Sequence, residues 1–296
     1  MGELNVSYET LTAGFLTLAQ RYTCAQYDSI GESICGRKIP VLRLGSGTRR
    51  IVYCAGQRGT DLQTAELLYL FAEEYCRGFA ERKSICSINI QYLSNTRTVY
   101  LLPILNPDGT VLAQTGTDEK NPLAPTLVSS HGDAHLYYRG NARGVDLSRN
   151  FDAGYEMGAD MREGARPVCG LHPESEPETA AVCAFLRAHA PVDMLISFRS
   201  GAEKIGWDGS GGADAKQKTV AGILSRLTGY PLAAAEGSGE DGSGEMDGLR
   251  DWFFKTFRTP AFTAECGPGA LSRDTVPTSA LYERLRPLFY TATVLG

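Results

Sequence analysis

Short apolar runs alternate with amphipathic segments along most of this chain, and this alternation limits the folds that it can adopt. Segments 39–44, 50–55, 99–105, 192–198 and 261–266 are apolar enough to form buried strands. Segments 7–22, 61–74, 175–188, 216–228, 249–257 and 281–290 are predicted to form helices. Strands that alternate with helices predict an α/β fold with a mixed, largely parallel sheet sandwiched between helices. Ligands of such sheets bind outside the carboxyl ends of the strands.

The composition agrees with a folded chain and argues against two classes of partner. Of the 296 residues, 43% are hydrophobic, which is enough to build a buried core. The net charge of -5 at pH 7 argues against nucleic acid, because phosphate binding needs a basic face. No apolar run is long enough to span a bilayer, and the N-terminus lacks the basic start and apolar stretch of a secretion signal. We therefore expect a cytoplasmic protein without a membrane partner, whose oligomeric state the sequence leaves open.

Eight cysteines are present, and none forms a C-x-x-C pair. This spacing argues against a zinc ribbon or a redox motif. Several of the cysteines lie inside apolar segments, so we expect most of them to be reduced core residues.

The stretch from Gly144 to Tyr155 has a short apolar start followed by a polar run that contains Arg149. It predicts a strand end that opens into a loop and presents this arginine. A guanidinium with several hydrogen-bonding neighbours suits a carboxylate ligand. For a single arginine, the alternative is a structural salt bridge.

The same stretch resembles the substrate-binding segment of the zinc carboxypeptidase (carboxypeptidase A-like) family, with Ser148 where the family has asparagine. Further segments resemble motifs of this family in the same order: Leu102–Gly109, Tyr138–Arg139, Ser175–Thr179, Asp193–Ser200, Asp251–Phe253 and Thr259–Glu265. The S-E-P-E-T segment is similar to the bacterial branch that cuts γ-D-glutamyl-diaminopimelate bonds in cell-wall peptides. The resemblance covers nearly the whole chain and implies one carboxypeptidase-like domain over residues 1–296.

The resemblance also implies roles for five side chains. Glu265 falls at the family's general-base position, and Arg139 at the position of an arginine that helps to polarise the scissile carbonyl. Arg149 and Ser148 fall where the family binds the substrate carboxylate, and Ser148 retains one hydrogen-bond donor. Arg250 falls near a position that tunes side-chain specificity, where it would favour an acidic group. The alternative for Arg250 is a solvated helix arginine.

The family's zinc ligands are absent from the positions where the resemblance places them. The family uses His-x-x-Glu and a later histidine, which leaves one coordination position open for water. These positions carry Gln57, Thr60 and Arg199 here. Arginine cannot donate a lone pair, and neutral amide and hydroxyl oxygens bind zinc poorly. We therefore expect no metal cofactor, with Arg199 in the metal's place and paired with Glu265; a shift of one residue would offer Asp61, a single carboxylate.

Three hypotheses follow from these departures. The first is a pseudo-peptidase that binds a peptide or a small carboxylate in the former active-site cleft without cutting it. The second is an active metallocarboxypeptidase or cell-wall-peptide hydrolase with atypical metal ligands, for which His131, Asp133 and His135 are the other candidates. The simpler interpretation of these three residues is a polar surface loop within 113–140. The third hypothesis is a scaffold for another protein.

Overall fold

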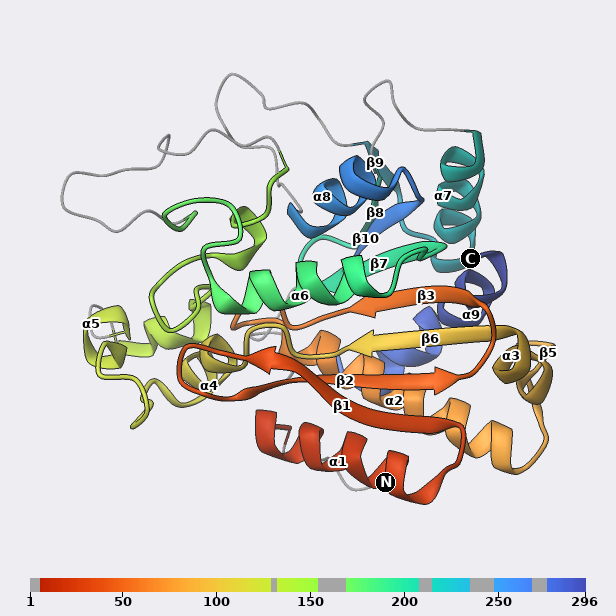
Figure 1. The fold of residues 1–296 in the computed structure, drawn as a ribbon, viewed down its shortest axis with the longest axis horizontal. Helices are drawn as coiled ribbons and strands as arrows, with labels where there is room; N and C mark the ends of the chain where they lie inside the picture. Colours follow the sequence, from red (N-terminus) through yellow and green to blue (C-terminus); the bar gives the residue numbers. More distant parts are fainter. Residues whose placement is uncertain (1–5, 129–131, 154–168, 208–214, 235–247, 268–275) are drawn as a thin grey trace.

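The computed structural model of the protein describes residues 6–128, 132–153, 169–207, 215–234, 248–267 and 276–296. In this part of the chain, a sheet of eight strands has the order β1-β2-β6-β3-β7-β10-β8-β9 (Figure 1). Its strands are β1 (Ala25–Glu32), β2 (Lys38–Gly45), β3 (Arg49–Cys54), β6 (Arg97–Leu102), β7 (Met194–Arg199), β8 (Lys204–Trp207), β9 (Leu232–Ala234) and β10 (Ala261–Glu265). A separate small hairpin contains β4 (Ser84–Ile85) and β5 (Ile88–Asn89).

The described helices connect these strands and cover them on both faces. They are α1 (Tyr8–Arg21), α2 (Leu62–Ala80), α3 (Ile90–Thr96), α4 (Pro107–Thr115), α5 (Ala124–Val128), α6 (Pro177–Ala188), α7 (Ala215–Thr228), α8 (Gly248–Phe257) and α9 (Thr278–Leu295). Two 3-10 turns, η1 (Gly132–Tyr137) and η2 (Leu147–Arg149), lie in the long connection between α5 and α6. Within the described ranges, no helix has both the length and the apolar character needed to cross a membrane.

The centre of the sheet is parallel. Strands β6, β3, β7 and β10 pair in parallel, whereas β1 and β2 pair antiparallel at one side and β8 pairs antiparallel with β10 at the other. The predicted mixed, largely parallel sheet is therefore confirmed. The carboxyl ends of β3 and β6 point toward the segment that carries α4 and α5 (Figure 1).

Each face of the sheet builds its own hydrophobic core because strand side chains alternate. On one face, Ile51 and Tyr53 pack with side chains from α1, α2, α7 and α9. On the other face, Val52 and Cys54 pack with side chains from α6 and α8. This second face carries the functional site. Leu195 and Ala261 point to it, and because side chains alternate along a strand, Ser197 and Arg199 of β7 and Thr263 and Glu265 of β10 point to it as well.

The cysteines follow the prediction of a reduced core. All eight are free thiols, and Cys24, Cys54, Cys76, Cys183 and Cys266 are buried. Cys35 and Cys169 are half-buried, and Cys86 is exposed.

Two local predictions were wrong. The stretch at Gly144 does not begin with a strand and leads directly into η2. The helix predicted from residue 175 begins at Pro177, with Glu176 as the N-cap residue.

Two elements begin or end in ways that the sequence analysis did not predict. Strand β1 continues to Glu32 across a bulge between Ser29 and Gly31. Helix α4 starts directly after Asn106, because the Asn106 side chain caps the helix and Pro107 occupies its first turn.

Glu178, in the first turn of α6, is a buried carboxyl group with weak partners. Its oxygens accept from the backbone nitrogen of Ile34 at 3.4 Å and from Asn141 Nδ2 at 3.4 Å. Burial raises the pKa of Glu178 from 4.5 to about 7, and the nearby Asp108 adds to this rise. The carboxylate form of Glu178 therefore opposes folding at neutral pH.

The raised pKa of Glu178 predicts that the free energy of unfolding falls as the pH rises. The unfolded chain loses the Glu178 proton near pH 4.5, whereas the folded chain keeps it until about pH 7. The free energy of unfolding therefore declines between these two pH values, by on the order of 3 kcal/mol for this group. In urea unfolding at pH 5 and pH 8, Glu178→Gln should show a smaller decline than the wild type and higher stability at pH 8. Glu9→Gln, which alters an exposed glutamate on α1, is the matched control. An equal decline in wild type and Glu178→Gln would contradict the prediction.

Candidate functional site

Arg199 and Glu265 form a buried ion pair at the carboxyl edge of the sheet. They are the last residues of the adjacent parallel strands β7 and β10 and lie opposite each other in the register. Arg199 Nε donates to Glu265 Oε1 at 3.2 Å, and Arg199 Nη2 bonds the same oxygen. The two residues are 2% and 1% exposed. Lys204 Nζ approaches Glu265 Oε1 at 3.5 Å, so two cations share one carboxylate oxygen. The predicted pairing of Arg199 with Glu265 is present.

Asp61 joins Arg58 to this pair. Its carboxylate is fully buried and accepts from the backbone nitrogens of Ser200 at 3.1 Å and Arg58 at 3.2 Å. Burial raises the pKa of Asp61, and the charges of Arg58 and Arg199 oppose this rise. Asp61 thus faces Arg199.

Two residues next to the predicted zinc-ligand positions belong to this network. Arg58 and Asp61 stand three positions apart, as the histidine and glutamate of His-x-x-Glu do, and Asp61 bonds the backbones of Arg58 and Ser200. Gln57 is buried as well, and its carbonyl accepts from Asn106, whereas Thr60 is only partly buried. The structure thus brings Asp61, the carboxylate that a shift of one residue would offer, close to Arg199.

Hydrogen bonds from the Asn106 side chain hold the segment that contains Arg139 beside residues 57–61. Asn106 Nδ2 donates to the carbonyls of Gln57 at 3.3 Å and Gly140 at 3.0 Å. The backbone nitrogen of Gly59 donates to the Arg139 carbonyl at 3.3 Å. A Cβ atom on Gly59 would lie 2.4 Å from the carbonyl oxygen of Gly109, so this close approach requires glycine.

Asp146 connects two of the predicted ligand-binding residues. Ser148 is buried, and its hydroxyl donates to Asp146 Oδ1 at 2.6 Å. Arg139 Nε lies 3.7 Å from Asp146 Oδ2, and the Arg139 side chain is 46% exposed. Arg149 ends η2 and is half-buried. The structure therefore brings Arg139, Ser148 and Arg149 onto one connected loop, while Tyr155 at the end of the motif lies outside the described residues.

Arg250 is held inside the protein. It is buried on the first turn of α8; its Nε donates to Asp251 Oδ1 at 2.7 Å, and its Nη1 donates to Thr263 Oγ1 at 3.4 Å. Thr263 lies on β10 two residues before Glu265. A Cβ atom on Gly248 would lie 2.2 Å from the Ser148 carbonyl oxygen, so α8 also touches the loop of Ser148. The alternative of a solvated helix arginine is wrong.

The side chains at the predicted zinc-ligand positions do not form a zinc-binding set. Among the described residues there, Gln57 and Thr60 offer neutral groups, and Arg58 and Arg199 offer cations. Asp61 is the one carboxylate apart from Glu265, which already bonds Arg199. Zinc sites of this geometry need three uncharged-nitrogen, thiolate or carboxylate ligands, and fixed cations repel the metal. Of the other candidates, His131 lies outside the described residues, as does the side chain of Asp133, and His135 is half-buried against Gly116.

One group elsewhere has metal-like spacing. Ligand atoms of Cys35, Asp108 and Asp118 lie within 4.8 Å of one another. Arg37 already supplies a cation there, because its Nη1 contacts Asp108 Oδ1 and Asp118 Oδ2 at 2.8 Å each. Burial and the charge of Asp108 raise the pKa of the Cys35 thiol to about 12, so at neutral pH it is protonated and a poor metal ligand. This group ties the β1–β2 hairpin to α4 through Arg37.

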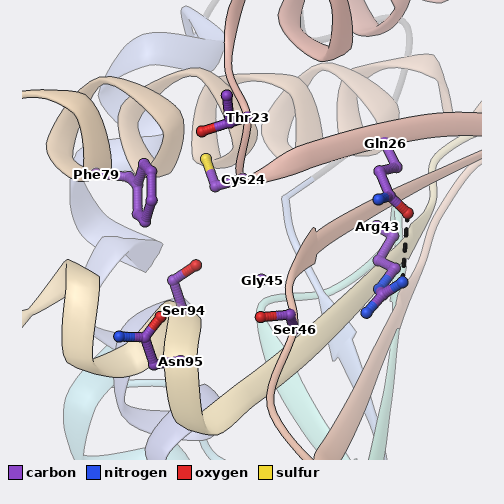
Figure 2. A pocket seen from close by; sticks show the side chains of 9 residues that line it. All are labelled: Thr23, Cys24, Gln26, Arg43, Gly45, Ser46, Phe79, Ser94 and Asn95. Atoms are coloured by element: carbon purple, nitrogen blue, oxygen red, sulfur yellow. Dashed lines mark hydrogen bonds between the residues drawn. The ribbon is translucent and has the colours of Figure 1, made fainter.

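Figure 2 shows a pocket of about 120 Å³ at the opposite end of the sheet. It is lined by Thr23, Cys24, Gln26, Arg43, Gly45, Ser46, Phe79, Ser94 and Asn95. Gly45 pairs with Thr98 near the start of β6, whereas the site above lies at the carboxyl ends of the parallel strands. The Arg43 guanidinium donates to Gln26 Oε1 at 3.3 Å across the wall of this pocket (Figure 2).

The fold and the site can now be compared with known proteins. The model of the zinc carboxypeptidase family matches residues 15–268, and the chain belongs to this family. It is 25% identical over 300 residues to γ-D-glutamyl-L-diamino acid endopeptidase 1 of Lysinibacillus sphaericus, covering 99% of this chain and 74% of that protein. An uncharacterised protein of Bacillus subtilis is 25% identical over 247 residues, and the match covers 81% of this chain and 64% of that protein.

Solved structures show the same fold. Thrombin-activatable fibrinolysis inhibitor aligns with a TM-score of 0.72 at 20% identity, over 98% of this chain and 72% of that one. The murein-tripeptide amidase of Escherichia coli O157 aligns with a TM-score of 0.53 at 20% identity, over 91% of each chain.

The members of the site that were not predicted include Arg58, Asp146, Ser200 and Lys204. Arg58 could have been found from its spacing to Asp61, which equals that of His-x-x-Glu. Asp146 lies in the motif at Gly144, but its link to Ser148 and Arg139 depends on the η2 turn. Ser200 contributes its backbone nitrogen to Asp61, and no sequence signal reports such a contact.

Proposed function

We propose that this chain binds an acidic peptide or amino-acid ligand through its carboxylates, and does not act as a zinc peptidase. The buried Arg199–Glu265 pair, with Asp61 and Arg58 beside it, supports this proposal most directly. These four residues fill the place that the family gives to zinc with fixed charges of both signs. Of the residues proposed to hold a carboxylate, in contrast, Arg139 and Arg149 match the family's arginines, and Ser148 replaces an asparagine.

The chemistry of these side chains argues against hydrolysis. A catalytic zinc makes hydroxide available near neutral pH, and no arginine does so. A general base must also accept a proton from water, and one of the two oxygens of Glu265, Oε1, is already bonded to Arg199 and lies 3.5 Å from Lys204. Without zinc, the other oxygen would have no metal-activated water from which to take a proton.

The ligand contacts that we propose lie on the loop of Ser148. Arg149 and Arg139 would bind a carboxylate through charge-assisted hydrogen bonds, and Asp146 positions Ser148 and Arg139. We also propose that Arg250, which is buried on α8 and paired with Asp251, favours an acidic ligand. The names of the endopeptidase and amidase relatives suggest acidic fragments of cell-wall peptides as the ligand class.

Zinc content and ligand binding test this proposal together. After zinc incubation and desalting at neutral pH, mass spectrometry should find essentially no zinc in the purified protein. Isothermal titration with short acidic and diaminopimelate-containing peptides should detect binding that Arg149→Ala weakens at least tenfold, because a charge-assisted contact is lost. Arg143→Ala is the matched control, since Arg143 is an exposed arginine on the same connection whose side chain contacts Glu176.

Three results would overturn the proposal. One zinc held tightly per chain would mean that other ligands exist and would restore the second hypothesis, an active peptidase with atypical ligands, which the names of the relatives favour. Turnover of any peptide in a broad panel, with or without added metals, would do the same. Absence of binding by every peptide would refute the carboxylate ligand.

A further inference from the structure

Four buried polar atoms at the carboxyl edge of the sheet have no hydrogen-bond partner within the described part of the chain. They are Gln57 Nε2, Arg58 Nε, Ser200 Oγ and Glu265 Oε2. Arg58, Ser200 and Glu265 belong to one network, because Asp61 bonds the backbones of Arg58 and Ser200, its charge interacts with that of Arg199, and Arg199 bonds Glu265. Gln57 directly precedes Arg58 in the chain. Buried polar groups are nearly always hydrogen-bonded, so several unsatisfied ones in one network indicate a place for a bound molecule.

The unsatisfied atoms define the chemistry of that molecule. Three of them are donors: an amide, a guanidinium and a hydroxyl group. The network contains three cations (Arg58, Arg199 and Lys204) and two carboxylates (Asp61 and Glu265), which leaves one net positive charge. Several donors and an excess positive charge favour a carboxylate.

Glu265 Oε2 indicates that the bound molecule also has a hydrogen-bond donor next to its carboxylate. This oxygen is an acceptor and lies beside Gly201, where a Cβ atom would come within 2.6 Å of it. A side chain at position 201 would therefore cover the oxygen. An ammonium group is the donor that best complements a buried carboxylate oxygen.

We propose that this network binds an α-amino-acid head group. We call Gln57, Arg58, Ser200 and Glu265 the inner site. The carboxylate of the head group accepts from the three donors, and its ammonium group donates to Glu265 Oε2. This inference rests on the proposed function, because zinc at this place would exclude the head group, and it deepens that function. Since Arg149 binds another carboxylate, the ligand class is a compound with carboxylates at two ends, at least one of them beside an ammonium group.

Isothermal titration with three small probes tests the inner site. The probe meso-2,6-diaminopimelate has an amino-acid head group at both ends, L-lysine lacks one of its carboxylates, and pimelate lacks both ammonium groups. The wild type should bind diaminopimelate at least tenfold more tightly than lysine and at least threefold more tightly than pimelate. Equal affinity for pimelate and diaminopimelate would refute the ammonium contact with Glu265.

Two variants separate binding from folding. Ser200→Ala removes a hydroxyl that has no partner in the described residues, so it should leave the urea midpoint unchanged and weaken diaminopimelate binding three- to tenfold. Arg58→Gln should weaken it at least tenfold. Lys83→Gln removes an exposed cation and is the control for net charge, with no expected change.

The outcomes distinguish the inner site from the proposed function. If Arg149→Ala weakens binding but Ser200→Ala and Arg58→Gln do not, the inner site is refuted and the proposed function stands. If an acidic peptide binds in an Arg149-dependent manner and diaminopimelate does not bind, the inner site is likewise refuted. If no probe and no peptide binds, the proposed function itself fails.

Discussion

Replacement of Arg199 by methionine is expected to lower the free energy of unfolding by about 3–5 kcal/mol, because it leaves a buried carboxylate without its main partner. Among the cations of the described residues, Glu265 would retain Lys204 at 3.5 Å, and Asp61 would lose one of its two neighbouring guanidinium charges. Urea unfolding at pH 7 measures this difference. The loss is larger than the value of a surface ion pair, which is typically below about 1 kcal/mol.

A double variant separates the cost of the unpaired charge from the value of the pair. Arg199→Met combined with Glu265→Met removes both charges and should recover most of the lost stability, since apolar replacement of a buried pair is often neutral. Lys204→Met is the matched single control, because that side chain is 29% exposed and should cost much less. If the free energy of unfolding of Arg199→Met lies within about 1 kcal/mol of the wild-type value, the pair does not contribute to stability as proposed.

The second large effect is expected at Arg37. Arg37→Met should also cost about 3–5 kcal/mol at pH 7, because Asp108 and Asp118 are buried carboxylates that share this one guanidinium. Burial acts to raise the pKa of Asp118, and Arg37 holds this pKa below its usual value, so removal of Arg37 would raise it. The unfolded chain would then release the Asp118 proton at lower pH than the folded chain, so the deficit should shrink when unfolding is measured at pH 4.5 instead of pH 7.

The same variant tests whether Arg37 occupies a potential metal site. Removal of the cation leaves Cys35, Asp108 and Asp118 with ligand atoms within 4.8 Å of one another. Zinc or another divalent cation should then raise the melting temperature of Arg37→Met and leave that of the wild type unchanged. Arg37→Lys, which keeps one charge, should fall between the two in stability and should not respond to metal. A wild type that is stabilised as much as the variant would contradict this assignment.

The sequence predicted the features of the fold that depend on apolar periodicity. The buried strands 39–44, 50–55, 99–105, 192–198 and 261–266 all exist, with bounds that move by a few residues. Strands β1, β8 and β9 were not predicted, because they lie at or near the edges of the sheet, where only one side is fully buried and the apolar signal is weak. Helix α4 was hidden by Asn106-Pro107-Asp108-Gly109, whose residues favour a turn and a helix start alike.

Residues of the candidate site could be predicted where they lie in a recognisable motif. They could not be predicted where their role depends on a contact between segments far apart in the sequence. Arg199 and Glu265 end two separate strands, and the resemblance was enough to pair them. The contacts of Asp61 were not predicted, because position alone cannot show that Asp61 bonds the backbone of Ser200. The burial of Arg250 depends on Thr263 and Asp251, and the helix periodicity around it gave no sign of either contact.

The charge network around Asp61 also bears on the evolution of this chain. Under the proposed loss of zinc, a return to a zinc-binding set within this network would need histidines in place of Arg58 and Arg199 and a longer carboxylate in place of Asp61. Each of these changes alone removes a buried guanidinium or crowds a buried carboxylate, while providing at most one metal ligand. Intermediates would lose stability before any metal could compensate for it, so selection would act against every single step. Under this proposal the loss of zinc is reversed only by several changes at once, and the network makes the loss effectively one-way.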